Sequence, residues 1–211
     1  MSELMLRTLV GVALIAAAAI ALILGGIVFW LLAVVVALLM MAEWSDLFAT
    51  PPQMKRLAQF SLSVPLAIMC PLAAGPGFLA LGLLVGAAFF IVIVSQRPPL
   101  AIGTLYAGLP VLSLVLIRHQ HDGILYAFWA MALVWVTDIG AYFAGRAIGG
   151  PKLAPAISPN KTWAGLIGGV VLAAVFGVVM HYAYGLAVRL TLASPLLAVL
   201  AQGGDLYESW L

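Results

Sequence analysis

Long apolar runs, separated by short polar or turn-forming breaks, occupy most of this 211-residue chain. A membrane-spanning helix needs about 20 predominantly apolar residues, within a range of roughly 17–25. Hydrophobic residues make up 65% of the chain and charged residues 8%, against roughly 45–50% and about 25% in soluble domains. Because no water-soluble fold could bury that much apolar surface, the sequence predicts an integral membrane protein.

We expect an all-α fold, a polytopic bundle of transmembrane helices with about eight spans. Glycine and proline at the breaks between the apolar runs terminate helices. The first two runs meet at Gly25-Gly26, which leaves open whether they form two helices or one long broken helix. The predicted spans cover residues 7–24, 26–42, 57–74, 76–95, 100–117, 123–145, 163–184 and 190–203.

Lysine and arginine are unevenly distributed between the two sides of this predicted bundle. If the eight spans alternate in direction, seven cations fall on one side and two, Arg118 and Arg189, on the other. Because cytoplasmic loops carry an excess of these residues, we expect the N-terminus, the loop 146–162 and the C-terminal end to face the cytoplasm. The net charge of +2 is too small to indicate a nucleic-acid partner. The seven cations are Arg7, Lys55, Arg56, Arg97, Arg146, Lys152 and Lys161.

Asp138 lies inside the sixth predicted span. A charged side chain that faces lipid at such a position costs at least about 2.5–3.5 kcal/mol. We therefore expect Asp138 to point into a cavity, toward a cation or toward a metal ion. A purely structural alternative is an ion pair with Arg146, but eight residues of helix span about 12 Å, so a direct pair would need a bend.

The segment 146–162 combines three cations, two hydroxyl side chains and three prolines, and its residue types suit phosphate. The seventh predicted span begins at its end, where a helix N-terminus attracts anions. The residues "NKT" at 160–162 do not form a P-loop, because Pro155 and Asn160 stand where that motif needs glycine. A basic loop that only sets topology stays open as the alternative. The candidate phosphate-binding residues are Arg146, Lys152, Ser158, Lys161 and Thr162.

Two acidic residues, Asp205 and Glu208, follow the last predicted span. They are three positions apart, so on a helix they share a face. Paired carboxylates suit a hard divalent cation, whereas an exposed acidic helix end is the alternative interpretation. In the predicted topology, Asp138, Lys161 and Asp205 arrive at one membrane face, as an interfacial active site requires.

Four sequence elements, taken in order, resemble the bacterial phosphatidate cytidylyltransferases, also called CDP-diacylglycerol synthases. The elements are "DIGAY" at 138–142, "KLAP" at 152–155, "SPNKTW" at 158–163 and "GDLYES" at 204–209. The resemblance covers about residues 90–211, and the N-terminal third matches only as apolar spans with one Glu-Trp pair. We therefore expect residues 1–95 to form N-terminal transmembrane helices and residues 96–211 to form the catalytic part.

The resemblance implies transfer of the cytidylyl group of CTP to phosphatidate, which gives CDP-diacylglycerol and pyrophosphate for phospholipid synthesis. It implies Mg²⁺ as the cofactor, with a monovalent cation such as K⁺ as a further candidate. It makes Asp138, Lys161 and Asp205 the catalytic residues, and assigns metal binding to Asp205, Asp138 and Glu208. Substrate binding is assigned to Arg146, Lys152, Ser158, Asn160 and Thr162.

The expected partners are CTP, phosphatidate and the lipid bilayer, without nucleic acid, and a homodimer is a candidate assembly. The expected location is the inner (plasma) membrane, with a multi-pass chain whose active site faces the cytoplasm. The family's pattern continues past the "GDLYES" element with further basic and acidic motifs, whereas this sequence stops at Leu211. The resemblance thus implies a chain truncated at its C-terminus, with an incomplete active site and no activity of its own.

Three other functions compete with this one. A polytopic transporter would explain Asp138, but it would not explain the cations that cluster beside a second acidic motif. A non-catalytic membrane subunit stays open as well. A CDP-alcohol phosphatidyltransferase is disfavoured, because Asp138-Ile139-Gly140 does not fit the Asp-Gly pair with which that family's motif begins.

Overall fold

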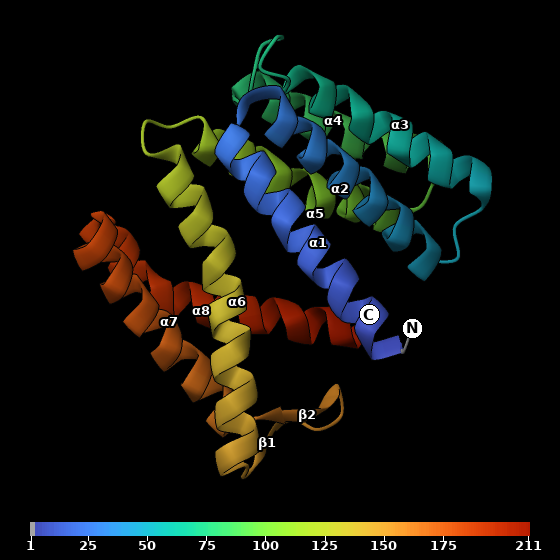
Figure 1. The fold of residues 1–211 in the computed structure, drawn as a ribbon. Coiled ribbons are helices and arrows are strands. Elements are labelled where there is room, and N and C mark those ends of the chain that lie inside the picture. Colours follow the sequence, from blue (N-terminus) through green and yellow to red (C-terminus); the bar gives the residue numbers. More distant parts are fainter. Residues whose placement is uncertain (1–2) are drawn as a thin grey trace. The chain divides into compact units, whose positions relative to one another are not determined.

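The computed structural model describes residues 3–211, in which eight helices and one two-stranded hairpin follow one another along the chain (Figure 1). The strands pair in antiparallel orientation. The predicted all-α fold class is therefore confirmed. The elements are α1 (Glu3–Leu24), α2 (Gly26–Leu47), α3 (Pro52–Ile68), α4 (Phe78–Ser95), α5 (Pro98–Arg118), α6 (Gly123–Ile148), β1 (Lys152–Ala154), β2 (Ser158–Thr162), α7 (Trp163–Tyr184) and α8 (Val188–Trp210).

Five of the described helices, α2, α4, α5, α6 and α7, are long and apolar enough to cross a membrane. The predicted bundle of membrane helices is confirmed, but about eight spans is more than the structure shows. The apolar part of α1 covers only Leu9–Leu24, and α3 has 17 residues with a polar first turn. Helix α8 carries Arg189 near its start and Asp205 and Glu208 near its end. The sequence reasoning counted apolar stretches and gave too little weight to the charges at their ends.

The described chain divides into two compact units, Met1–Ile124 (unit 1) and Leu125–Leu211 (unit 2). The predicted division after residue 95 rested on where the motifs begin and not on compactness. It stays a prediction about function.

In unit 1, helices α2 to α5 form a four-helix bundle in which each helix packs against the next and α5 closes against α2. The core contains one fully buried large side chain or more from each of these helices, for example Met41, Leu62, Leu84 and Leu100. The indole Nε1 of Trp44 donates a hydrogen bond to the Pro99 carbonyl oxygen at 2.8 Å. This bond ties the end of α2 to the beginning of α5.

Helices α1 and α2 are two separate helices that pack against each other, which answers the question left open by the sequence. The chain reverses at Gly25, whose φ of +63° is a conformation that glycine adopts without steric cost. Arg118, the last residue of α5, donates from Nε to the Leu22 carbonyl oxygen at 2.8 Å. The last turn of a helix has carbonyl groups without partners inside the helix, so this arginine stabilises the end of α1.

In unit 2, glycines allow α6 and α7 to approach closely. A Cβ atom added to Gly140 would lie 2.8 Å from the Gly168 carbonyl oxygen, and one added to Gly169 would lie 2.8 Å from the Thr137 carbonyl oxygen. Small residues at helix crossings are a common means of tight packing in membrane proteins. The contact places the part of α6 that contains Asp138 directly against the first half of α7.

Helix α8 completes unit 2 by packing along α7. Ser194 of α8 lies opposite Gly177 of α7, where an added Cβ would approach the serine Oγ to 2.6 Å. The same Oγ accepts a hydrogen bond from Trp129 Nε1 of α6 at 3.1 Å. The three helices therefore meet at one buried serine, and α8 continues from there to Asp205.

A β-hairpin that the sequence did not predict connects α6 to α7. Lys152 pairs with Thr162 and Ala154 pairs with Ser158, with an irregularity between the two pairs. Three prolines indicated a stiff loop, and strands as short as three and five residues carry no clear alternating pattern. The pairing holds both ends of the segment, so Lys161 lies on a fixed strand that leads directly into α7.

Candidate active site

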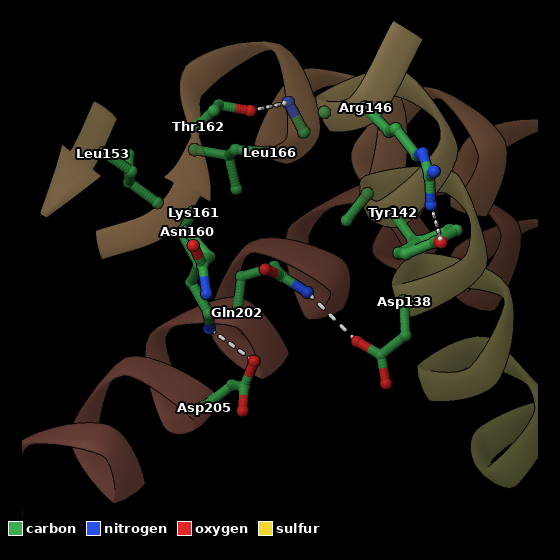
Figure 2. Close-up of a pocket in the computed structure, with 13 residues that line it drawn as sticks. Asp138, Tyr142, Arg146, Leu153, Asn160, Lys161, Thr162, Leu166, Gln202 and Asp205 are labelled. Carbon is green, nitrogen blue, oxygen red and sulfur yellow. Dashed lines mark hydrogen bonds and ion pairs between the residues drawn. The ribbon is translucent and has the colours of Figure 1, made fainter. Parts of the chain in front are cut away.

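A cavity of about 540 Å³ lies in unit 2, where α6, β2, the beginning of α7 and the end of α8 meet (Figure 2). Small and apolar residues from α6, β1 and α7 form part of its wall. Polar side chains from α6, β2 and α8 form the rest. The polar lining residues are Asp138, Tyr142, Arg146, Asn160, Lys161, Thr162, Gln202 and Asp205.

The cavity brings together most of the site residues that the sequence predicted. The three proposed catalytic residues, Asp138, Lys161 and Asp205, all line it, although each belongs to a different element. Arg146, Asn160 and Thr162 line it as well. Lys152, Ser158 and Glu208 are not among its lining residues, and their assigned roles stay predictions.

Helix α6 presents Asp138, Tyr142 and Arg146 to the cavity because residues four apart lie on one face of a helix. Arg146 donates from Nη1 to the Tyr142 hydroxyl oxygen at 2.8 Å. Asp138 accepts a hydrogen bond on Oδ1 from Gln202 Nε2 at 3.1 Å. Within the described residues, the alternative ion pair between Asp138 and Arg146 is therefore not formed.

Lys161 and Asp205 form an ion pair between β2 and α8. The lysine side chain is 18% exposed and the aspartate side chain 52%, so the pair reaches from the protein interior to the open cavity. The buried Nζ atom makes this ionic contact without a hydrogen bond of good geometry. Because an ammonium group has three donors, Lys161 retains the capacity to bind an anion in the cavity.

Thr162 has a local structural role at the beginning of α7. It is buried, and its Oγ1 accepts a hydrogen bond from the Gly165 backbone N–H at 3.1 Å. This is the N-cap arrangement, in which a side-chain oxygen satisfies one of the free N–H groups of the first helical turn. The cap fixes the backbone next to Lys161.

Replacement of Thr162 by Ala is expected to destabilise the protein by about 1 kcal/mol, because the capping hydrogen bond is lost. Replacement by Ser retains the hydroxyl group and should leave the protein close to its original stability. Thermal unfolding of the purified variants in detergent measures both effects. Equal melting temperatures for the Ala and Ser variants would show that the cap contributes nothing.

Two lining residues, Gln202 and Tyr142, were missed by the sequence reasoning. Each nevertheless had a signal in the sequence. Gln202 is a polar residue at the end of an apolar run, three positions before Asp205, and Tyr142 is four positions after Asp138. Both spacings place the residue on the same helix face as a predicted carboxylate.

The donor set of the cavity fits one particular kind of metal site. In the part of the chain that the structure describes, no group of three or more His, Cys, Asp or Glu side chains could hold a metal ion by itself. Mg²⁺ in proteins is usually bound by one or two carboxylates together with substrate phosphates and water. Asp138 and Asp205 supply two carboxylates to one cavity beside a lysine. These residues fit a Mg²⁺ ion that binds together with phosphate groups.

Comparison with known proteins places the chain in a family. A sequence profile described as "Cytidylyltransferase family" matches residues 5–211. The chain is 40% identical over 202 residues to a phosphatidate cytidylyltransferase of Brucella suis biovar 1 (strain 1330), which covers 89% of this chain and 72% of that protein. It is 38% identical over 116 residues to a phosphatidate cytidylyltransferase of Bacillus subtilis (strain 168), which covers 53% of this chain and 43% of that protein. The predicted resemblance is confirmed, and the chain belongs to the cytidylyltransferase family.

Proposed function

We propose that the protein transfers the cytidylyl group of CTP to phosphatidate, producing CDP-diacylglycerol and pyrophosphate. It is an enzyme of phospholipid synthesis, a nucleotidyltransferase embedded in a membrane. One observation carries this proposal beyond the family match. A lysine with a buried Nζ atom and two carboxylates, contributed by α6, β2 and α8, line a single cavity.

The reaction requires charge control more than a protein nucleophile. A phosphate oxygen of phosphatidate attacks the α-phosphorus of CTP and forms the new P–O bond. The bond from the α-phosphorus to the bridging oxygen breaks, and pyrophosphate leaves with that electron pair. Because the attacking oxygen is already anionic, no serine, cysteine or histidine has to be activated. Catalysis then depends on positioning and on neutralisation of the phosphate charges.

The residues that line the cavity have different roles in positioning the substrates and neutralising the phosphate charges. Lys161 binds the triphosphate as a positive charge next to the start of α7, and Arg146 adds a second cation from α6. Asp138 and Asp205 would hold Mg²⁺, which would neutralise charge on the phosphate oxygens. Thr162 holds the lysine backbone in place by capping α7. We further propose Asn160, Lys152 and Ser158 at the substrate, Glu208 at the metal, a K⁺ ion and a homodimer.

We also propose that the protein resides in the inner (plasma) membrane, with its cavity open to the cytoplasm. The segment 146–162 joins α6 to α7, two helices that can cross a membrane, and it carries three of the nine lysine and arginine residues, an excess typical of cytoplasmic loops. The β-hairpin also supports this orientation. It carries two of these cations, Lys152 and Lys161, and Lys161 lines the cavity, so the cavity and these cations lie at the same end of unit 2.

Cysteine labelling tests the orientation. The lone Cys70 is first replaced by Ala, and a cysteine is then introduced in place of either Ala156, which is exposed between the two strands, or Tyr184, which is exposed at the far end of α7. A membrane-impermeant maleimide should label position 156 in inside-out vesicles only and position 184 in intact spheroplasts only. Labelling of position 156 from the outside would refute the proposed orientation.

The reaction itself is tested in membranes from cells that express the reading frame up to its stop codon. We expect labelled CDP-diacylglycerol and pyrophosphate to form only when both CTP and phosphatidate are present. A transporter or a non-catalytic subunit would form neither product. Absence of product under conditions in which a curated relative is active would overturn the proposal.

A further inference from the structure

Gln202 is a buried amide side chain at the point where α8 meets α6. The residue is 6% exposed, and its Nε2 donates to Oδ1 of Asp138 at 3.1 Å. Figure 2 shows the amide between the two carboxylates, with Asp138 on one side and Asp205 on the other. Asp205 lies three residues after Gln202, so both side chains project from one face of α8.

This hydrogen bond differs from those that the buried hydroxyl groups of Thr137 and Ser194 donate. The hydroxyl groups of Thr137 and Ser194 donate to backbone carbonyl oxygens four residues earlier in their own helices. Each of these hydroxyl groups therefore donates its hydrogen bond within its own helix. The Gln202 amide instead bonds to a side chain 64 positions away on another helix. Burying an amide costs free energy unless it is hydrogen-bonded, so this contact accounts for a polar side chain at the end of an apolar run.

We infer that Gln202 is a positioning residue for Asp138 in metal binding. By holding Oδ1, it fixes the rotation of the carboxylate and leaves the second oxygen without a hydrogen bond within the described chain. Because Gln202 and Asp205 share a face of α8, the same contact sets the spacing between the two carboxylates. The inference rests on the proposed function, in which Asp138 and Asp205 hold Mg²⁺.

The effect of such a positioning residue on metal affinity has a typical size. Groups that hydrogen-bond to the ligating side chains orient them, and loss of such a group typically lowers metal affinity or activity 10–100-fold. Replacement of Gln202 by Met keeps the length of the side chain and removes the amide. We therefore expect this variant to bind Mn²⁺, used as a spectroscopic probe for Mg²⁺, about 10–100-fold more weakly.

Two measurements test the inference on purified protein in lipid nanodiscs. Electron paramagnetic resonance titration with Mn²⁺ in the presence of CTP, without phosphatidate, reports metal affinity without turnover, and the Mg²⁺ concentration for half-maximal turnover reports it during turnover. Replacement of Ser194 by Ala is the matched control. It removes a buried hydrogen-bonding group from the same helix, outside the cavity, and should change stability without changing either metal constant.

The possible results of these measurements distinguish the positioning role of Gln202 from the proposed function. A folded Gln202→Met variant whose Mn²⁺ and Mg²⁺ constants stay within twofold of the unaltered protein would overturn the inference. If that variant does not fold, Gln202→Asn, which keeps the amide but is too short to reach Asp138 unaltered, should still weaken metal binding. Failure of the unaltered protein to bind Mn²⁺ would overturn the inference and the assigned metal site together. CTP-dependent product formation would still decide the proposed function independently.

Discussion

In protein expressed from the complete reading frame, replacement of Asp205 by Asn is expected to lower the rate of CDP-diacylglycerol formation by about 10²–10³-fold. The change keeps the shape of the side chain and removes its charge. Loss of one preorganised group that stabilises transition-state charge commonly costs this much in rate. The measurement is CTP-dependent product formation at matched amounts of protein in the membrane, with Mg²⁺ varied so that a weakened metal site is visible.

The ion pair between Lys161 and Asp205 makes it possible to distinguish a catalytic role of these residues from a purely structural one. If the pair only held β2 against α8, exchanging the two charges in a Lys161→Asp, Asp205→Lys double variant would restore much of the activity. If each residue acts on a different part of the substrate complex, the exchange should restore nothing. We expect the second result, because both residues line the same cavity.

A second ion pair provides the control. Lys55 Nζ and Asp46 Oδ2 lie 2.6 Å apart in unit 1, and neither residue lines the cavity. Exposed pairs of this kind contribute roughly 0–1 kcal/mol. Replacement of Asp46 by Asn should therefore leave turnover within about twofold of the unaltered protein. Similar losses for Asp205→Asn and Asp46→Asn would place the chemistry elsewhere.

Replacement of Gly140 by Ala is expected to destabilise the protein by about 1–3 kcal/mol, the usual cost of overpacking. The added methyl group would lie 2.8 Å from the Gly168 carbonyl oxygen and 2.9 Å from Leu172 Cβ. A backbone oxygen cannot rotate away as a side chain does, so α6 and α7 must separate. Because Asp138 is two residues from Gly140, the cavity should widen and turnover should fall with stability.

The matched control for this prediction is Gly86 in α4. It lies in the middle of a helix that can cross the membrane, and an added Cβ would meet no atom within 4 Å. Its replacement by Ala should leave the melting temperature unchanged or raise it, because alanine favours helix. Thermal unfolding in detergent compares the two variants. Equal melting temperatures would show that the close contact of α6 with α7 at Gly140 does not limit the stability of the protein.

The helices could be predicted because apolar length is a property of each segment alone. Membrane helices satisfy their own backbone hydrogen bonds, so a run such as 163–184 specifies an element without reference to the rest of the chain. The predicted range coincides closely with α7, Trp163–Tyr184. The hairpin could not be predicted in this way. Its strands depend on pairing with each other and on the Trp163 N–H bond to the Pro151 carbonyl oxygen, 3.1 Å in length.

The candidate site was predicted only as far as charge and topology allow. The cost of a carboxylate inside a span singled out Asp138, and the distribution of lysine and arginine placed Lys161 and Asp205 at the same membrane face. Neither argument says which helix lies beside which. The ion pair of Lys161 with Asp205 and the bond from Gln202 to Asp138 depend on that lateral arrangement, which close glycine contacts determine.

All residues that line the cavity belong to unit 2, between Asp138 and Asp205. Natural selection therefore acts on the two units by different criteria. A mutation in unit 1 is retained as long as the bundle of α2 to α5 still packs in a bilayer, a condition that many combinations of apolar residues fulfil. A mutation at the cavity is retained only if nucleotide transfer continues. Among descendants of one ancestral gene, unit 1 should accumulate substitutions faster while keeping its hydropathy, and the few polar residues of unit 2 should be the slowest positions to change.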